Sequence, residues 1–95
     1  MTVDMVSGGG TARIITRALS DGDLATADAE AQRLTIAQTV DVLERLSAQH
    51  RAVLYRLLPK EQASEAFEEL PPVLQKDLLE ALKDEEVAAV FDDLD

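Results

Sequence analysis

The sequence predicts an all-α fold, a right-handed helical superhelix of about seven helices in which short helix pairs stack as a solenoid. One pattern of apolar and acidic residues recurs with a period of about 24 residues, within the range typical of repeat architectures, as the motifs ending at Leu46, Leu70 and Leu94 show. Apolar residues inside the repeat follow helical spacing, and strand-like alternation is nearly absent. A fixed period of this length is typical of stacked helices whose neighbouring units share one core.

The N-terminal part of the chain divides into a tail and the first helix. Residues 1–10 are expected to form a flexible tail, because small polar residues and three glycines lose too much entropy on ordering. An acidic helical domain is expected over residues 11–95, beginning with a helix over residues 11–19. Gly22 suits the left-handed turn after this helix, and Asp23 suits the cap of the next.

Capping residues and prolines place the other helix boundaries. Thr35 and Gln38 have the spacing of a capping box, so a helix is expected to begin between them. Ser47 can cap the following helix, and Pro59 ends it because proline lacks the N–H that a helix interior requires. Asp84 can cap the last helix. The remaining helices are expected over residues 24–34, 36–46, 60–70 and 73–82.

Negative charge is concentrated in the C-terminal part of the chain. The net charge is −10, and residues 60–95 hold twelve acidic residues against three lysines. A field of this sign repels the phosphate backbone, so nucleic acid is not expected as a partner. It attracts cations or a basic protein surface instead. Many of these acidic residues can also be explained as a solvated outer face that keeps the domain soluble.

Several functional classes lack the residues they need. The chain has no cysteine, and its only histidine, His50, has no neighbouring ligand for a zinc site. No serine has a recognisable base partner, so no enzyme is expected. No apolar stretch approaches the ~18 residues of a membrane span, and no signal peptide opens the chain. A cytoplasmic location without direct membrane insertion fits these features.

The run from Val42 to Pro72 carries a family resemblance. A leucine-leucine-proline turn at residues 57–59 leads into a helix that ends in Glu-Glu-Leu at residues 68–70, before a further proline. This order resembles the intracellular N-terminal domain of MgtE-type magnesium transporters, over about residues 17–95. The chain departs from that family at residues 35–36, where Thr-Ile stands in place of its usual histidine-proline.

The resemblance implies a function and partners. It implies a cytoplasmic regulatory domain on the inner side of the cell membrane, packed through its acidic face against a CBS domain pair. Magnesium ions between these surfaces would hold the transporter compact and favour a closed pore. The chain would then be an excerpt of a longer membrane protein, homodimeric at full length, whose CBS pair and transmembrane domain lie elsewhere in the polypeptide.

The same resemblance implies candidate Mg²⁺ contacts. Glu65 matches the position of a family glutamate that is associated with cation at the interdomain face. Asp92, Asp93 and Asp95 form a second candidate group, near the stretch where other family cation sites lie. Mg²⁺ is usually held by one or two carboxylates plus water, so any site here is expected to be weak and shared with a partner domain. The alternative that Glu65 is an ordinary solvated residue stays open.

A second hypothesis comes from a different functional class. Acidic, leucine-rich helix pairs are also found in protein-binding modules, such as the armadillo-type helices of flagellar motor switch proteins, and such a module would not sense metal. The sequence that follows Asp95 discriminates the two hypotheses. A CBS pair followed by hydrophobic spans would support the transporter, and an unrelated domain would support the interaction module.

Overall fold

The computed structural model describes residues 8–92, which form seven α-helices and no strand. The predicted all-α class is therefore confirmed. The helices are α1 (Gly8–Ser20), α2 (Leu24–Gln32), α3 (Ile36–Arg45), α4 (Ala48–Leu57), α5 (Lys60–Glu69), α6 (Pro72–Ala81) and α7 (Glu85–Asp92).

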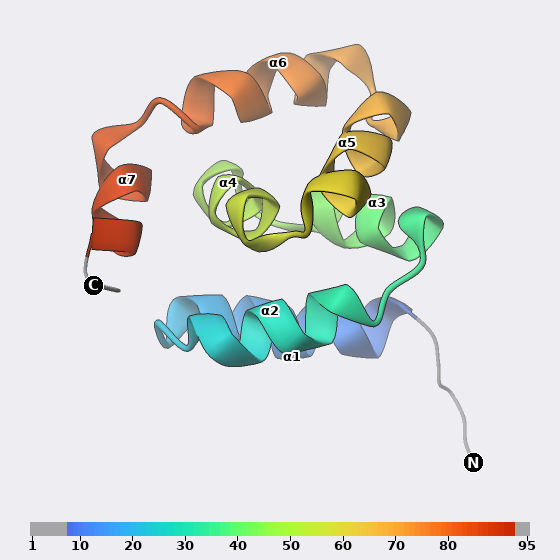
Figure 1. The fold of residues 1–95 in the computed structure, drawn as a ribbon, viewed down its shortest axis with the longest axis horizontal. Helices are drawn as coiled ribbons and strands as arrows, with labels where there is room; N and C mark the ends of the chain where they lie inside the picture. Colours follow the sequence, from blue (N-terminus) through green and yellow to red (C-terminus); the bar gives the residue numbers. More distant parts are fainter. Residues whose placement is uncertain (1–7, 93–95) are drawn as a thin grey trace.

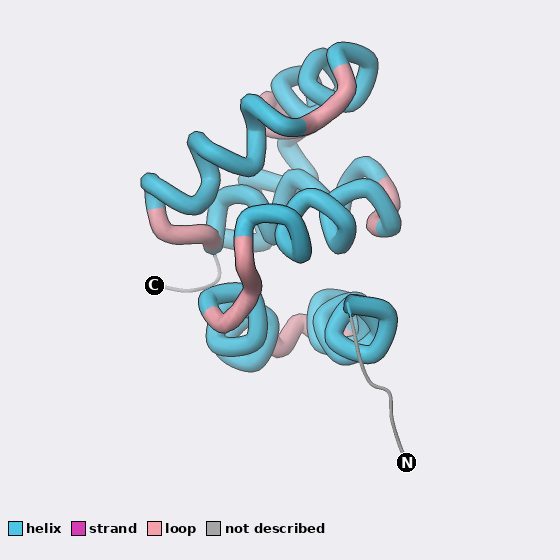
Figure 2. Tube along the Cα trace, turned by 90° about the vertical axis from the view of Figure 1, so that its right-hand side faces the viewer, coloured by secondary structure: helices cyan, strands magenta, loops and turns pink. Residues whose placement is uncertain are grey.

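The helices stack so that each helix from α1 to α4 contacts the second helix after it along the chain. α1 packs on α3 and α3 on α5, while α2 packs on α4 and α4 on α6. Figures 1 and 2 show α1 and α2 as a pair of neighbouring helices beneath the others. The starts of α3 and α5 are as far apart in the sequence as those of α4 and α6, and this spacing equals the predicted period. The handedness of the superhelix stays a prediction.

The turn between α1 and α2 has the two features predicted for it. Gly22 adopts a φ of 76°, in the left-handed region that glycine enters without steric cost. Asp23 caps α2, since its carboxylate accepts from the backbone N–H of Thr26 at 3.2 Å and from the Thr26 hydroxyl at 2.6 Å. Both hydrogen bonds lower the pKa of Asp23 below its ordinary value, and the bond from the Thr26 hydroxyl has the larger effect.

The other predicted caps are present as well. Thr35 and Gln38 form the reciprocal capping box of α3, at 2.9 Å and 3.1 Å. The Ser47 hydroxyl accepts from a backbone N–H in the first turn of α4, and the Asp84 carboxylate does the same for α7. Pro59 takes the capping position before α5 without a side-chain hydrogen bond. Local sequence therefore determines where these helices start.

The structure differs from the predicted boundary at the N-terminal end. α1 begins at Gly8, so the last part of the predicted tail, residues 8–10, belongs to the helix. A helix nucleated over residues 11–19 extends at low cost, because each added residue gains a hydrogen bond without a new nucleation step. The rest of the predicted tail, residues 1–7, lies outside the described residues.

The predicted apolar stripes form most of one continuous core. Its largest fully buried side chains include Ile15, Leu43, Leu54 and Leu78, one each from α1, α3, α4 and α6. Ile14, the residue before Ile15 in α1, is 48% exposed. Consecutive helical residues point about 100° apart, so Ile14 lies to one side of the face that Ile15 buries.

Three long polar side chains tie the stacked helices together. Arg51 is buried, and its guanidinium donates to the carbonyl oxygens of Leu43 at 2.7 Å and Leu46 at 2.8 Å. These carbonyls end α3 and have no partner within that helix, so a buried cation satisfies them. Gln75 donates to the carbonyl oxygen of Phe67 at 2.7 Å, which joins α6 to α5. The third such side chain is Gln62.

Gln62 connects three helices through a single amide group. Its Nε2 donates to the carbonyl oxygen of Ala31 at 2.9 Å and to the hydroxyl of Thr39 at 2.8 Å. The Thr39 side chain is fully buried and its hydroxyl donates in turn to the carbonyl oxygen of Thr35 at 2.8 Å. The start of α5 is thus anchored on α2 and α3, which fixes the orientation of α5.

Candidate functional site

The predicted candidate Glu65 lies on a solvent-facing side of α5 together with other acids. Glu61 precedes it by four residues, while Glu68 and Glu69 follow it by three and four. Residues at these offsets are neighbours on a helix surface. All four side chains are exposed. We call these four residues the acidic face.

Packing on the opposite side of α5 sets the direction of the acidic face. Ala63 and Ala66 are buried against the core, and Gln62 is held by its hydrogen bonds to α2 and α3. α5 packs on α3 through this apolar side. Glu65 therefore points to solvent because the small alanines permit close helix packing only on the other side.

No hydrogen bond or ion pair joins a side chain of the acidic face to a basic group within the part of the chain that the structure describes. The ion pairs there are Arg33 with Glu30 at 4.0 Å and Arg45 with Asp41 at 2.9 Å, both before α4. Like charges four residues apart on a helix repel by a few tenths of a kcal/mol per pair, roughly 0.2–0.5. The acidic face thus carries unrelieved repulsion that a cation can reduce.

The acidic face does not form a metal cage by itself. Among the described residues, no group of three or more His, Cys, Asp or Glu side chains converges closely enough to hold a metal ion. Mg²⁺ keeps several of its waters and needs only one or two carboxylates. Glu65 could supply one of them, and a second surface would have to supply the other.

The second predicted group of acids falls at the edge of the described chain. Asp92 is the last residue of α7, and its side chain is outside the part that the structure describes. Asp93 and Asp95 lie outside the described residues altogether. Their role as Mg²⁺ contacts therefore stays a prediction.

Comparison with known protein families identifies the domain. A family model described as the MgtE intracellular N domain matches residues 34–95. The chain belongs to this family. The match includes α3 to α7, and therefore Glu65 and the rest of the acidic face. No curated protein and no solved structure matches the chain.

Membership of the MgtE N-domain family confirms the resemblance inferred from the leucine-leucine-proline turn. It makes this chain a helical domain of the type associated with magnesium transport. None of the described helices is long and apolar enough to cross a membrane. α1 and α2 precede the matched range, so they are an addition to the part that the family model describes.

One cleft of the structure was not anticipated from the sequence. It opens between α1 and α3, has a volume of about 630 Å³, and is lined by Arg13, Arg17 and Arg45 together with Gly10, Ala12 and Thr16. Arg13 and Arg17 are four residues apart, a spacing visible in the sequence, but the approach of Arg45 depends on how α1 packs on α3. This cleft lies apart from the acidic face and is not a site for cations.

Proposed function

We propose that this chain is a magnesium-responsive regulatory domain of an MgtE-type transporter, on the cytoplasmic side of the membrane. In this proposal the acidic face docks against a CBS domain pair of the same transporter, with Mg²⁺ between the two surfaces. The observation that carries it is the acidic face itself, with Glu65 at its centre and no described ion pair to neutralise it. The family match supports the assignment.

The mechanism follows from the electrostatics of two like-charged surfaces. Two unit charges 4 Å apart interact with about 1 kcal/mol in water and about 4 kcal/mol at the effective dielectric of a protein surface. Two acidic surfaces therefore separate when no cation is present. A hydrated Mg²⁺ that contacts a carboxylate from each side converts this repulsion into attraction. The ion then favours the compact arrangement by its difference in affinity for the two states.

The free energy needed to shift the equilibrium from the separated to the compact arrangement indicates that several Mg²⁺ ions bind. Moving an equilibrium from 1:99 to 99:1 needs about 5.5 kcal/mol of differential binding. One exposed carboxylate supplies less than this, because the water around it screens its charge. The four carboxylates of the acidic face offer room for more than one ion, so Glu65 is proposed as one contact among several.

The experiment uses the longer polypeptide in which this domain is joined to its CBS pair. Limited proteolysis is followed while Mg²⁺ replaces Na⁺ at constant ionic strength, so that screening is the same at every point. We expect Mg²⁺ to protect the domain with a saturable midpoint. Glu65→Gln should move that midpoint to higher Mg²⁺. Asp21→Asn, which removes an exposed charge from the α1–α2 turn, should leave it unchanged.

Two results would contradict the proposal. Equal protection by Na⁺ and Mg²⁺ at the same ionic strength would show that screening alone is at work. Equal midpoints for Glu65→Gln, Asp21→Asn and the unsubstituted protein would place the ions elsewhere. A polypeptide that carries an unrelated domain in place of the CBS pair would instead favour the protein-interaction module.

A further inference from the structure

The cleft between α1 and α3 is an island of positive charge in an acidic protein. Arg13 and Arg17 line it from α1 and Arg45 lines it from α3. The only acid bonded to these groups within the described residues is Asp41, which accepts from Nε of Arg45 at 2.9 Å. The three guanidinium groups of the cleft and the one carboxylate bonded to them sum to a charge of about +2, whereas the whole chain carries −10. Asp21 and Asp23 line a separate pocket on the other side of Arg17.

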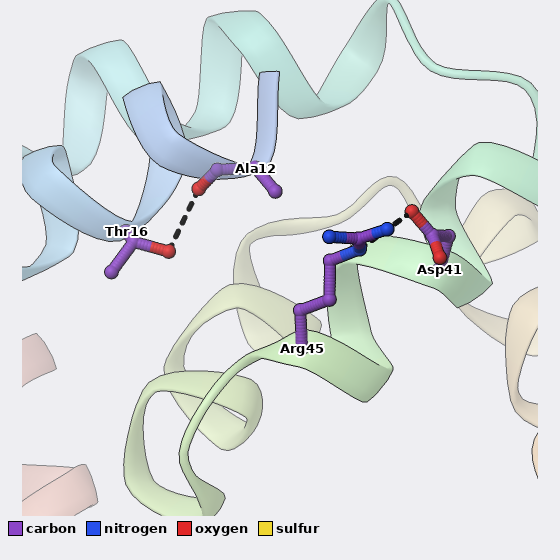
Figure 3. Close-up of polar contacts among 4 residues, drawn as sticks. All are labelled: Ala12, Thr16, Asp41 and Arg45. Carbon is purple, nitrogen blue, oxygen red and sulfur yellow. Dashed lines mark hydrogen bonds and ion pairs between the residues drawn. The ribbon is translucent and has the colours of Figure 1, made fainter. Parts of the chain in front are cut away.

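The arginines of the cleft have unused hydrogen-bond donors. Arg13 and Arg17 pair with no described residue, and the bond to Asp41 uses only Nε of Arg45, so its two terminal nitrogens remain available. Figure 3 shows Arg45 reaching from α3 towards the space beside α1, where Thr16 also points. The Thr16 hydroxyl donates to the carbonyl oxygen of Ala12 at 2.7 Å, so its proton is already engaged. The donors for a ligand are therefore the guanidinium groups.

We propose that this cleft binds a small, soluble phosphate-bearing ligand, such as a phosphate ester. A guanidinium group binds phosphate through paired N–H donors in a fixed fork, which makes arginine the preferred residue for this recognition. Three such groups suit a ligand with three or more charged oxygens, while a single carboxylate is satisfied by one arginine. The volume of about 630 Å³ falls within the range of small-molecule sites, roughly 300–1,000 Å³.

The charge of the whole chain favours a small ligand over a membrane surface. An anionic bilayer would meet the −10 charge of the protein over a wide area and be repelled. A small anion inside the cleft responds mainly to the nearest charges, because the Debye length is only about 8 Å at physiological salt. The local charge of the cleft then dominates its binding.

Titration with inorganic pyrophosphate tests this site on the chain itself. Binding is measured by calorimetry and by backbone amide NMR shifts, without divalent cations, with sodium chloride added to keep ionic strength constant. We expect saturable binding with shifts concentrated at residues 11–17 and at Arg45. Arg13→Gln, Arg17→Gln and Arg45→Gln should each weaken binding about tenfold, since each removes a charge-assisted hydrogen bond. Lys76→Gln, which removes an exposed cation from α6, should leave the affinity unchanged.

The shift map of the unsubstituted protein needs no variant to fold, so it tests the site independently. Absence of saturable binding, shifts spread over the surface, or equal weakening by Lys76→Gln would overturn the proposal. Tighter binding of a polyglutamate peptide than of pyrophosphate would overturn the phosphate assignment. Co-sedimentation with vesicles containing phosphatidylserine, lost in Arg17→Gln, would show a lipid headgroup as the source and overturn the assignment to a soluble ligand. None of these outcomes depends on the acidic face of α5.

Discussion

Arg51 and Gln75 stand one repeat period apart, and each donates to the backbone carbonyl oxygen eight residues before it. The Arg51 bond to Leu43 and the Gln75 bond to Phe67 are both 2.7 Å long. Leu43 and Phe67 are therefore separated by the same period. The repeat thus preserves a tertiary hydrogen bond as well as an apolar pattern, although the donor changes from a cation to an amide.

Replacing Arg51 tests the importance of this bond. We expect Arg51→Leu to lower the free energy of unfolding by about 2–4 kcal/mol, because two buried carbonyl oxygens lose their donors. Arg51→Gln should cost less, since an amide at the equivalent position already makes one such bond in the next unit. Urea unfolding followed by circular dichroism measures both. Equal losses for the two variants would show that the carbonyl bond is not the cause.

The contact between Gln62 and Thr39 predicts coupling between two repeats. Single substitutions Gln62→Leu and Thr39→Val should each destabilise the fold, because each removes the hydrogen bond between the two side chains and leaves the remaining polar group with one partner fewer. The double variant should be less destabilised than the sum of the two, with a coupling of about 0.5–1.5 kcal/mol. A double-mutant cycle in urea measures this coupling. Strict additivity would mean that the hydrogen bond makes no net contribution.

Stability should depend on the protonation of Asp23 in acid. Its hydrogen bonds with Thr26 hold the pKa of the Asp23 carboxyl below the ordinary value of 3.8. A carboxyl with a lower pKa in the folded state contributes stability above its unfolded pKa and loses that contribution as pH falls towards the folded pKa. Asp23→Asn keeps a capping oxygen without a titrating group. The difference in unfolding midpoint between the two proteins should therefore be constant above about pH 5 and change only below about pH 4.

An NMR titration provides the control for the Asp23 prediction. Thr26→Val removes the hydroxyl that makes the 2.6 Å bond to the carboxylate. The Asp23 pKa should then rise towards its ordinary value, because this bond is the largest cause of the shift. An unchanged titration curve in Thr26→Val would contradict the assigned cause.

Gly22 and Gly10 should respond in opposite directions to alanine. Gly22→Ala should cost about 1 kcal/mol, because the position has a φ of 76°. Gly10→Ala should stabilise by roughly 0.5–1 kcal/mol, since Gly10 lies in a helix. A new Cβ meets nothing within 4 Å at either site, so steric clash plays no part. Thermal unfolding of both variants checks the two signs, and equal signs would contradict the backbone argument.

Most helix boundaries could be predicted because their signals are local. The capping box at Thr35, the cap at Ser47 and the glycine turn at Gly22 each act over three or four residues, and all three are present. The burial of Arg51 could not be predicted in this way. Its partner carbonyls lie at the end of the preceding helix, and only the angle between α3 and α4 brings them within reach.

The path of α7 also required the structure. The repeat places α7 in the position that follows α5, yet it packs against α4, with Val87 buried there. The exposed direction of Glu65 could be inferred from its apolar neighbours Ala63 and Ala66 on the same helix. The arginine cleft could not, because its two sides come from helices that are separated by α2.

The sequence spacing from the start of α3 to the start of α5 equals that from α4 to α6, and this has a consequence for how the architecture can vary in length. If a segment of one full period were deleted, the helix one period later could pack in the position of the deleted helix, because the two present similar apolar faces. A single-residue insertion within a helix would instead rotate every following side chain away from its neighbours. Length changes in such a chain are therefore best tolerated in whole helix pairs, which makes duplication a simple route by which domains of this kind lengthen.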